Sequence, residues 1–225
     1  MRGFGATELL RAGLLEEVAV VLAGADGSVE NGAQATAPAI AASCRGLGAR
    51  VIEWPLNLDD MPSLEARVEG AVAELLEREL TDELGVLLAL DGAGLFASAA
   101  AAVDSRYALR ACLQASWIVT RALTVGALLA NGRGGRIVYV APAACAGEHA
   151  DAARAGLENL ARTLSIEWAR HSITTVAIAP PAELDDRAVG EVAALTAYLA
   201  SPAGAYFSGC QLDLRGPWSP TANAV

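Results

Sequence analysis

Short strand-like segments alternate with helical segments along almost the whole chain of 225 residues. The strand-like runs are apolar and rich in β-branched residues, and they lie at 17–23, 50–54, 85–90, 136–140, 174–179 and 211–214. Segments with helical spacing or composition lie between them, at 35–47, 64–80, 105–129, 152–170 and 189–199. Because parallel strands need helical crossovers, this order predicts an α/β fold with one doubly wound parallel sheet. No linker or repeat interrupts the pattern, so residues 1–225 are predicted to form a single domain.

The composition predicts a large buried core and excludes several partners. Hydrophobic residues make up 54% of the chain, charged residues 19%, and the formal net charge is −10. Because such a surface repels phosphate backbones, we expect no nucleic-acid partner. Arg121 interrupts the longest apolar stretch, and residues 1–14 lack the pattern of a signal peptide. We therefore expect no membrane segment and a cytoplasmic location.

The cysteines and histidines show no ligand spacing. No Cys-x-x-Cys pair occurs, and the two histidines are 22 positions apart. We therefore expect no metal site. Reduced, buried thiols are expected at Cys44, Cys112, Cys145 and Cys210.

The chain contains no lysine, since all 16 of its basic residues are arginine. This absence excludes every mechanism that needs a lysine. Among them are a Schiff base, a P-loop phosphate contact, and a lysine that tunes a catalytic tyrosine.

Several segments resemble the short-chain dehydrogenase/reductase family, in particular its 3-oxoacyl-carrier-protein reductase branch. The family's fourth strand is similar to GGRIVYVAP, and the helix and strand after its active-site tyrosine are similar to RAGLENLARTLSIEWARHSITTVAIAP. The last helix and strand are similar to EVAALTAYLASPAGAYFSGCQLDLRG, and the Asn-Asn-Ala-Gly segment to GVLLALDGAG. The resemblance implies a Rossmann-like fold. It also implies a shortened substrate lid, because residues 180–187 lead almost directly into the last helix.

The resemblance places the family's catalytic positions on residues that cannot perform the reaction. The asparagine, serine, tyrosine and lysine positions fall on Cys112, Pro142, Ala150 and Arg154. Alanine has no proton to transfer, and the planar guanidinium of arginine differs in shape from the compact ammonium of lysine. We therefore expect no catalytic residue, and Arg154 to be a solvated or interface side chain.

Two nearby side chains are the possible replacements. Tyr139 lies on the fourth strand of the family pattern, and His149 precedes the tyrosine position. A tyrosine inside a strand is usually packed, and a histidine before a helix is usually solvated.

The cofactor loop of the family also departs from its pattern. The family's T-G-x-x-x-G-x-G falls on residues 23–32, where the glycine spacing is lost and Asp26 and Glu30 would repel phosphates. We expect no bound cofactor, with weak NAD(P) binding as the alternative. The candidate cofactor contacts are Gly24, Gly27, Glu53, Asp91, Gly92 and Gly94.

The best-preserved segments are those that form interfaces in the family. The resemblance implies a dimer through helices 105–129 and 152–170 and a second interface through segment 189–214. We therefore predict a homo-oligomer, or a hetero-oligomer with an active reductase of this family.

These observations favour a non-catalytic structural or regulatory subunit in acyl-chain or polyketide-type metabolism. One alternative is an active NAD(P)-dependent oxidoreductase with a rearranged site. Another is a metabolite-binding sensor that uses the vacated pocket.

Overall fold

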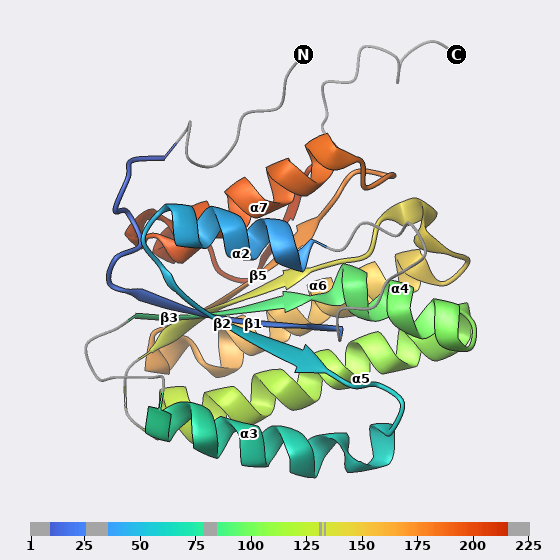
Figure 1. The fold of residues 1–225 in the computed structure, drawn as a ribbon, viewed down its shortest axis with the longest axis horizontal. Helices are drawn as coiled ribbons and strands as arrows, with labels where there is room; N and C mark the ends of the chain where they lie inside the picture. The colour runs from blue at the N-terminus through green and yellow to red at the C-terminus, as the bar shows by residue number, and fades with distance from the viewer. Residues whose placement is uncertain (1–9, 26–35, 79–84, 131, 133, 216–225) are drawn as a thin grey trace.

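A computed structural model describes residues 10–25, 36–78, 85–130, 132 and 134–215. Six parallel strands form one sheet in the order β2-β1-β3-β4-β5-β6 (Figure 1). The strands are β1 (Val18–Ala25), β2 (Arg50–Leu56), β3 (Gly85–Asp91), β4 (Gly135–Val140), β5 (Ile173–Ala179) and β6 (Cys210–Asp213). The predicted doubly wound, Rossmann-like sheet is therefore confirmed. Its strand order reverses between β1 and β3, which is where such sheets bind ligands.

Helices cover both faces of the sheet. The helices are α2 (Ala37–Gly46), α3 (Leu64–Arg78), α4 (Gly92–Ala102), α5 (Ser105–Leu123), α6 (Ala150–Glu167) and α7 (Asp186–Ala200). Helices α2 and α7 lie on one face, and α3, α5 and α6 lie on the other (Figure 1). Helix α4 follows β3 directly at the carboxyl edge of the sheet.

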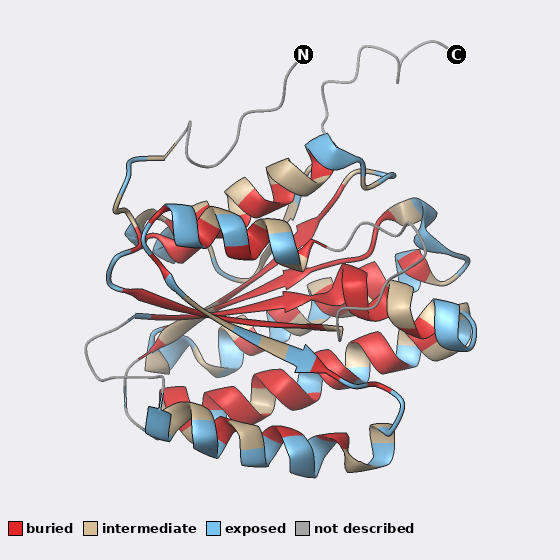
Figure 2. Cartoon of the chain, viewed as in Figure 1, coloured by how far each residue is buried: buried red, intermediate tan, exposed pale blue. Residues whose placement is uncertain are grey.

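The alternation of side chains along the strands divides the core in two. In β1, Val18, Val20 and Leu22 pack toward α2 and α7, whereas Ala19 and Val21 pack toward α3, α5 and α6. Figure 2 shows the resulting buried sheet between two layers of half-buried helices. Because both faces are covered, β1 is apolar along its length and β3 is apolar from Val86 to Leu90, rather than only at alternate positions.

Helix α4 is the one α-helix within the described residues that the sequence pattern missed. Its sequence is GAGLFASAAAA, in which most residues are small or apolar. The helix therefore shows no apolar stripe opposite a polar face. Its N-terminus begins immediately after the last residue of β3, Asp91, which caps it by accepting a hydrogen bond from the Gly94 amide.

Helix α5 continues into the π-helical turn Thr124–Leu129 (η2) and is the longest helix described. The whole segment Ser105–Leu129 is long and apolar enough to cross a membrane by length and composition, but 61% of its most apolar window is buried in the fold. Burial of most of this window is typical of a core helix, and the expectation of no membrane segment remains a prediction.

The free cysteines also differ from the expectation. Cys44 and Cys112 are buried, as predicted, but Cys210 is half-buried and Cys145 is exposed. Cys145 is exposed because it lies in the short 3₁₀ turn Ala144–Ala146 between β4 and α6. Within the described ranges, no three His, Cys, Asp or Glu side chains gather to hold a metal.

Candidate functional site

The carboxyl ends of the six parallel strands meet at one edge of the sheet, where α/β proteins bind their ligands. The connections that begin there are short. Residues 180–185 join β5 to α7, in agreement with the predicted short connection. Two charged side chains are buried at this edge, Asp91 at the end of β3 and Arg154 in the first turns of α6.

Asp91 lies at the point where the strand order reverses. Its side chain is 1% exposed, and its Oδ1 atom accepts a hydrogen bond of 2.6 Å from Thr36 Oγ1 and one of 3.0 Å from the Gly94 amide. The Oδ2 atom accepts from the Ala37 amide at 3.2 Å. Burial raises the pKa of this carboxyl above its ordinary value, although the three hydrogen bonds oppose the rise. Asp91 therefore joins the beginnings of α2 and α4 instead of facing an open site.

The candidate glycines pack against this carboxyl and its neighbours. A Cβ on Gly94 would lie 2.5 Å from Asp91 Oδ2, and one on Gly24 would lie 3.3 Å from Asp91 Cβ. A Cβ on Gly92 would lie 2.6 Å from the Val140 carbonyl oxygen. These glycines are therefore explained by close packing of the chain against itself.

The other two cofactor candidates are Glu53 and Gly27. Glu53 is exposed on β2 and forms an ion pair with Arg45. Gly27 lies outside the described residues, as do Asp26 and Glu30.

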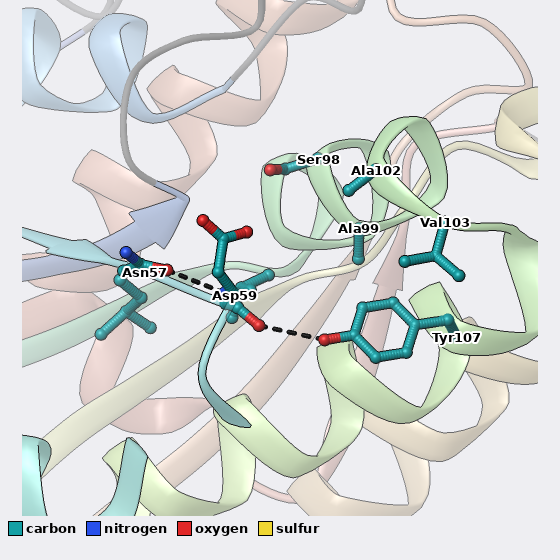
Figure 3. A pocket seen from close by; sticks show the side chains of 9 residues that line it. Asn57, Asp59, Ser98, Ala99, Ala102, Val103 and Tyr107 are labelled. Atoms are coloured by element: carbon teal, nitrogen blue, oxygen red, sulfur yellow. Dashed lines mark hydrogen bonds between the residues drawn. The ribbon is translucent and has the colours of Figure 1, made fainter. Parts of the chain in front are cut away.

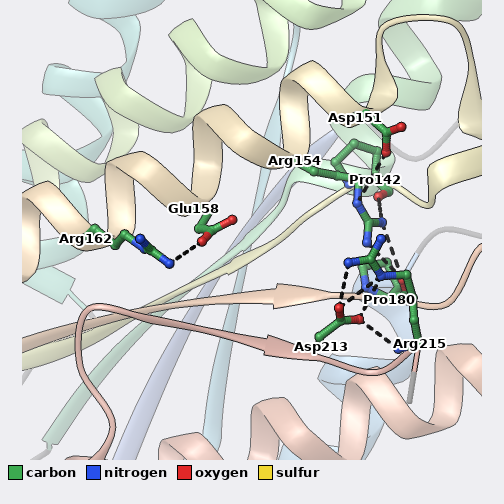
Figure 4. A network of polar contacts seen from close by, with 8 residues as sticks. All are labelled: Pro142, Asp151, Arg154, Glu158, Arg162, Pro180, Asp213 and Arg215. Carbon is green, nitrogen blue, oxygen red and sulfur yellow. Dashed lines mark hydrogen bonds and ion pairs between the residues drawn. The ribbon is translucent and has the colours of Figure 1, made fainter. Parts of the chain in front are cut away.

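Arg154 connects the loops that follow β4 and β5. Its guanidinium donates to the Pro142 carbonyl at 2.7 Å and to the Pro180 carbonyl at 3.4 Å, and only 4% of the residue is exposed (Figure 4). Burial, followed by repulsion from Arg215, lowers its pKa, whereas Asp151 and Asp213 oppose that change. The expectation of a solvated or interface arginine is wrong, because the side chain is directed inward onto two backbone carbonyls.

A pocket of about 330 Å³ opens beside this edge, between the end of β2 and the C-terminal half of α4 (Figure 3). Tyr107 forms one wall and donates a hydrogen bond of 3.0 Å to the Leu58 carbonyl. The polar groups at its surface are Asn57, Asp59 and Ser98. This pocket could not be predicted from the sequence pattern, because α4 was not predicted.

The sequence matches no protein-family model and no curated protein. Solved structures are nevertheless similar over nearly the whole chain. A short-chain dehydrogenase from Mycobacterium smegmatis matches with a TM-score of 0.65 at 17% identity, over 96% of this chain and 97% of that one. A putative NAD(P)-dependent gluconate 5-dehydrogenase from Beutenbergia cavernae, with bound NADP, matches with a TM-score of 0.61 at 22% identity, over 89% and 96%.

A putative short-chain dehydrogenase from Escherichia coli CFT073 matches with a TM-score of 0.65 at 14% identity, over 91% of this chain and 98% of that one. The chain has the short-chain dehydrogenase/reductase fold. At these identities the likeness concerns the fold alone, and the chemistry has to be argued from the site.

The resemblance placed the family's catalytic residues at positions that are buried in this structure. Ala150 is fully buried at the start of α6, and the carbonyl of Pro142 is occupied by Arg154. Cys112 Sγ donates to the Gly92 carbonyl at 3.4 Å, and burial raises the pKa of this thiol to about 12. The thiol therefore stays protonated near neutral pH.

The two possible replacements are in different environments. Tyr139 is completely buried, its hydroxyl shares a hydrogen bond of 3.0 Å with Thr120 Oγ1, and burial raises its pKa. His149 is half-buried at the cap of α6, and its Nδ1 atom lies 2.9 Å from Ser105 Oγ. Of these two side chains, only His149 has access to solvent.

Proposed function

We propose that this chain is a non-catalytic relative of the short-chain dehydrogenases/reductases that acts as a structural or regulatory subunit. The observation that carries the proposal is the position of Arg154. At the place that the resemblance gives to the family's lysine, the guanidinium is buried and donates to the carbonyls of Pro142 and Pro180. It holds two loops together and has no access to a substrate.

A reductase of this type needs a proton donor at the substrate oxygen and a bound hydride donor. Ala150 and Pro142 carry no titratable group, and a guanidinium keeps its proton in proteins. The 4% exposure of Arg154 also leaves it no access to a ribose hydroxyl. These features support the absence of acid–base chemistry at this edge.

The proposed partner is an active reductase of the same fold, or a second copy of this chain, in acyl-chain or polyketide-type metabolism. The metabolic setting rests on the similarity of several segments to 3-oxoacyl-carrier-protein reductases. The interface rests on exposed apolar side chains. The described residues expose five large hydrophobic side chains, and four of these lie in the segments 105–129, 152–170 and 189–214: Trp117, Val125, Ile166 and Tyr206. Exposed apolar groups of this kind mark interaction surfaces when they gather into a patch.

The test compares the assembly state of the wild type with that of Ile166→Arg. Ile166 lies on α6 and is 79% exposed, so we expect the arginine to disrupt an interface while changing the free energy of unfolding by less than about 0.5 kcal/mol. Ala66→Arg, on the exposed face of α3, is the matched control and should leave assembly unchanged.

Light scattering after size exclusion, with native mass spectrometry of the tagged chain from its source cells, measures the outcome. We expect an oligomer or a complex with a second chain of this fold, and its loss in Ile166→Arg. A wild type that is monomeric and associates with no such chain would contradict the proposal.

The pocket beside α4 favours a second candidate, a metabolite-binding sensor. Its volume of about 330 Å³ falls within the range of small-ligand sites, roughly 300–1,000 Å³. Val103 lines it and is 63% exposed, so Val103→Trp should fill the pocket. A small molecule that is retained by the wild type and lost in this variant would favour the sensor. An active oxidoreductase would have to rely on His149, and His149→Ala would then abolish its turnover.

A further inference from the structure

An apolar hollow of about 270 Å³ opens on the outer surface between α3 and the end of α5. Its apolar lining consists of Val72, Ala73 and Leu76 from α3 and of Ala122, Val125 and Gly126 from the end of α5 and η2. A Cβ on Gly126 would lie 2.9 Å from Val72 Cγ1, so this glycine lets the π-helical turn lie close to α3. Val125 in the same turn is 54% exposed. Turns of this kind are frequent at functional sites.

Charged side chains stand at the rim of this α3–α5 hollow. Arg121 and Glu69 both line it, and the guanidinium of Arg121 forms ion pairs with Glu65 and, at 3.0 Å, with Glu69. An apolar centre inside a charged, solvent-exposed rim is typical of a protein–protein contact. Because Arg121 is already paired, the centre of the hollow suits an apolar side chain rather than a charged ligand.

Ile166 is an apolar side chain without a cover within the described part of the chain. It lies on α6 and is 79% exposed. Helix α5 lies between α3 and α6 in one layer and packs against both (Figure 1). The three helices run in the same direction, because each connects parallel strands of one sheet and returns against them.

Ile166 and the α3–α5 hollow lie at the same level along this layer. A Cβ on Gly156 of α6 would lie 2.7 Å from the side chain of Leu113 of α5, so these two residues are side by side. Ten residues farther along each helix are Ile166 and Leu123. The two helices rise equally per residue, and Leu123 is next to Ala122, which lines the hollow. The exposed side chain and the hollow therefore flank the end of α5 on opposite sides.

We propose that two copies of this chain associate through this face, with Ile166 of each copy inserted into the α3–α5 hollow of the other. A two-fold interface joins one surface patch to itself, so the inserted side chain and its hollow must belong to the same patch. An axis perpendicular to the helix layer at the end of α5 exchanges their positions. Each contact then buries apolar surface that is exposed in the single chain. The inference rests on the proposed function, because it takes Ile166 as an interface residue, and it commits to a second copy as the partner.

The test uses one variant on each side of the contact. Ile166→Arg removes the inserted side chain, and Ala73→Glu places a carboxylate in the hollow, where it would lose its water on association. Each change should raise the dissociation constant of the wild-type dimer by about 100-fold or more, as expected at the centre of an interface. Sedimentation velocity measures the masses. Both positions are exposed, so thermal unfolding should show melting temperatures within about 3 °C of the wild type.

Mixing the two variants tests the reciprocal contact. In the mixed dimer, the intact Ile166 of the Ala73→Glu chain meets the intact hollow of the Ile166→Arg chain, and the two new charges are opposite. An equimolar mixture should therefore form a heterodimer whose dissociation constant is within about tenfold of the wild-type value. Native mass spectrometry with one tagged chain distinguishes this heterodimer from either homodimer.

Ala42→Glu is the matched control, because Ala42 is an exposed alanine on α2, across the sheet from the hollow. It should leave the dimer unchanged and should not restore association when mixed with Ile166→Arg.

The outcomes separate this inference from the proposed function. Loss of the dimer in Ile166→Arg, with an intact dimer in Ala73→Glu or no heterodimer in the mixture, would overturn the inference and leave the proposed subunit role standing. A purified wild type that is monomeric would also overturn it, while a complex with an active reductase would still support that role. A dimer unaffected by Ile166→Arg would contradict both.

Discussion

The carboxyl edge of the sheet and the outer faces of α5 and α6 differ in how their side chains are accommodated. Buried polar side chains at the edge find hydrogen-bond partners within the chain, whereas large apolar side chains on the outer helix faces are left uncovered. At the edge, Asp91 and Arg154 are almost completely buried, and their hydrogen-bond partners come from the same chain. On the helices, Trp117 is 42% exposed and Ile166 is 79% exposed. The polar side chains at the edge, where a ligand would normally bind, are already hydrogen-bonded within the chain. The apolar side chains on α5 and α6, which would normally be covered, face outward.

This difference suggests where the chain interacts with other molecules. A buried charged group is stable only when it is paired or hydrogen-bonded, so Asp91 and Arg154 fix the edge in a closed arrangement. Exposed apolar side chains gain free energy when a partner covers them. The comparison therefore favours an interaction surface over a catalytic cleft.

The largest effect is expected for Arg154→Ala. The change leaves the buried carbonyls of Pro142 and Pro180 without their donor, which should lower the free energy of unfolding by about 3 kcal/mol. The control is Arg162→Ala, on the exposed side of the same helix, where the ion pair with Glu158 contributes less than about 1 kcal/mol. Urea unfolding of both variants measures the difference. Equal losses would mean that Arg154 does not hold the edge closed.

A smaller effect is expected in the pH dependence of Asp91→Asn. Because burial raises the pKa of Asp91, the folded chain holds this proton more tightly than the unfolded chain does. The contribution of this proton to the free energy of unfolding is fully present at pH values below the pKa of an unfolded aspartate, about 3.9. It is lost as the pH rises through the raised pKa of Asp91 in the folded chain.

Asparagine does not titrate, so the stability of the wild type relative to Asp91→Asn should fall with rising pH across that window. Asp60 and Asp213, whose pKa values are lowered, titrate in both proteins and cancel from the difference. Chemical denaturation from pH 3 to pH 8 provides the curves. A difference that stayed constant or rose with pH would show that Asp91 is not buried as described.

The smallest effect is expected for Tyr139→Phe. This change removes one buried hydrogen bond and leaves Thr120 Oγ1 without a partner, which should destabilise the fold by about 1 kcal/mol. Tyr139→Phe combined with Thr120→Val should be less destabilising than the sum of the two single changes. If the wild type showed a reductase turnover that Tyr139→Phe abolished, the structural role would be refuted.

The sequence was sufficient to predict the strands because their β-branched runs are short and bounded by turn residues. It also predicted that Tyr139 would be packed, since RIVYV is apolar at most positions and typical of a strand buried on both faces. Helix α4 was missed because it consists mostly of alanine and glycine and therefore shows no helical stripe.

The candidate site was harder to predict, because its contacts join distant segments and the backbone. Arg154 binds carbonyls 12 and 26 residues away, and carbonyl groups leave no signature in the sequence. Asp91 binds Thr36 from 55 residues away. The sequence singled out both charged residues, but only the fold determines whether each faces a ligand or the interior.

The most direct measurement is a titration of the purified wild-type chain, free of other reductases, with NADPH, followed by calorimetry and by the fluorescence of the bound nicotinamide. If Asp91 and Arg154 close the carboxyl edge, no saturable binding should occur up to about 1 mM, the upper end of the usual range of KM values. The same chain should not oxidise NADPH in the presence of a 3-oxoacyl thioester. A micromolar dissociation constant, accompanied by turnover of that substrate, would contradict the account.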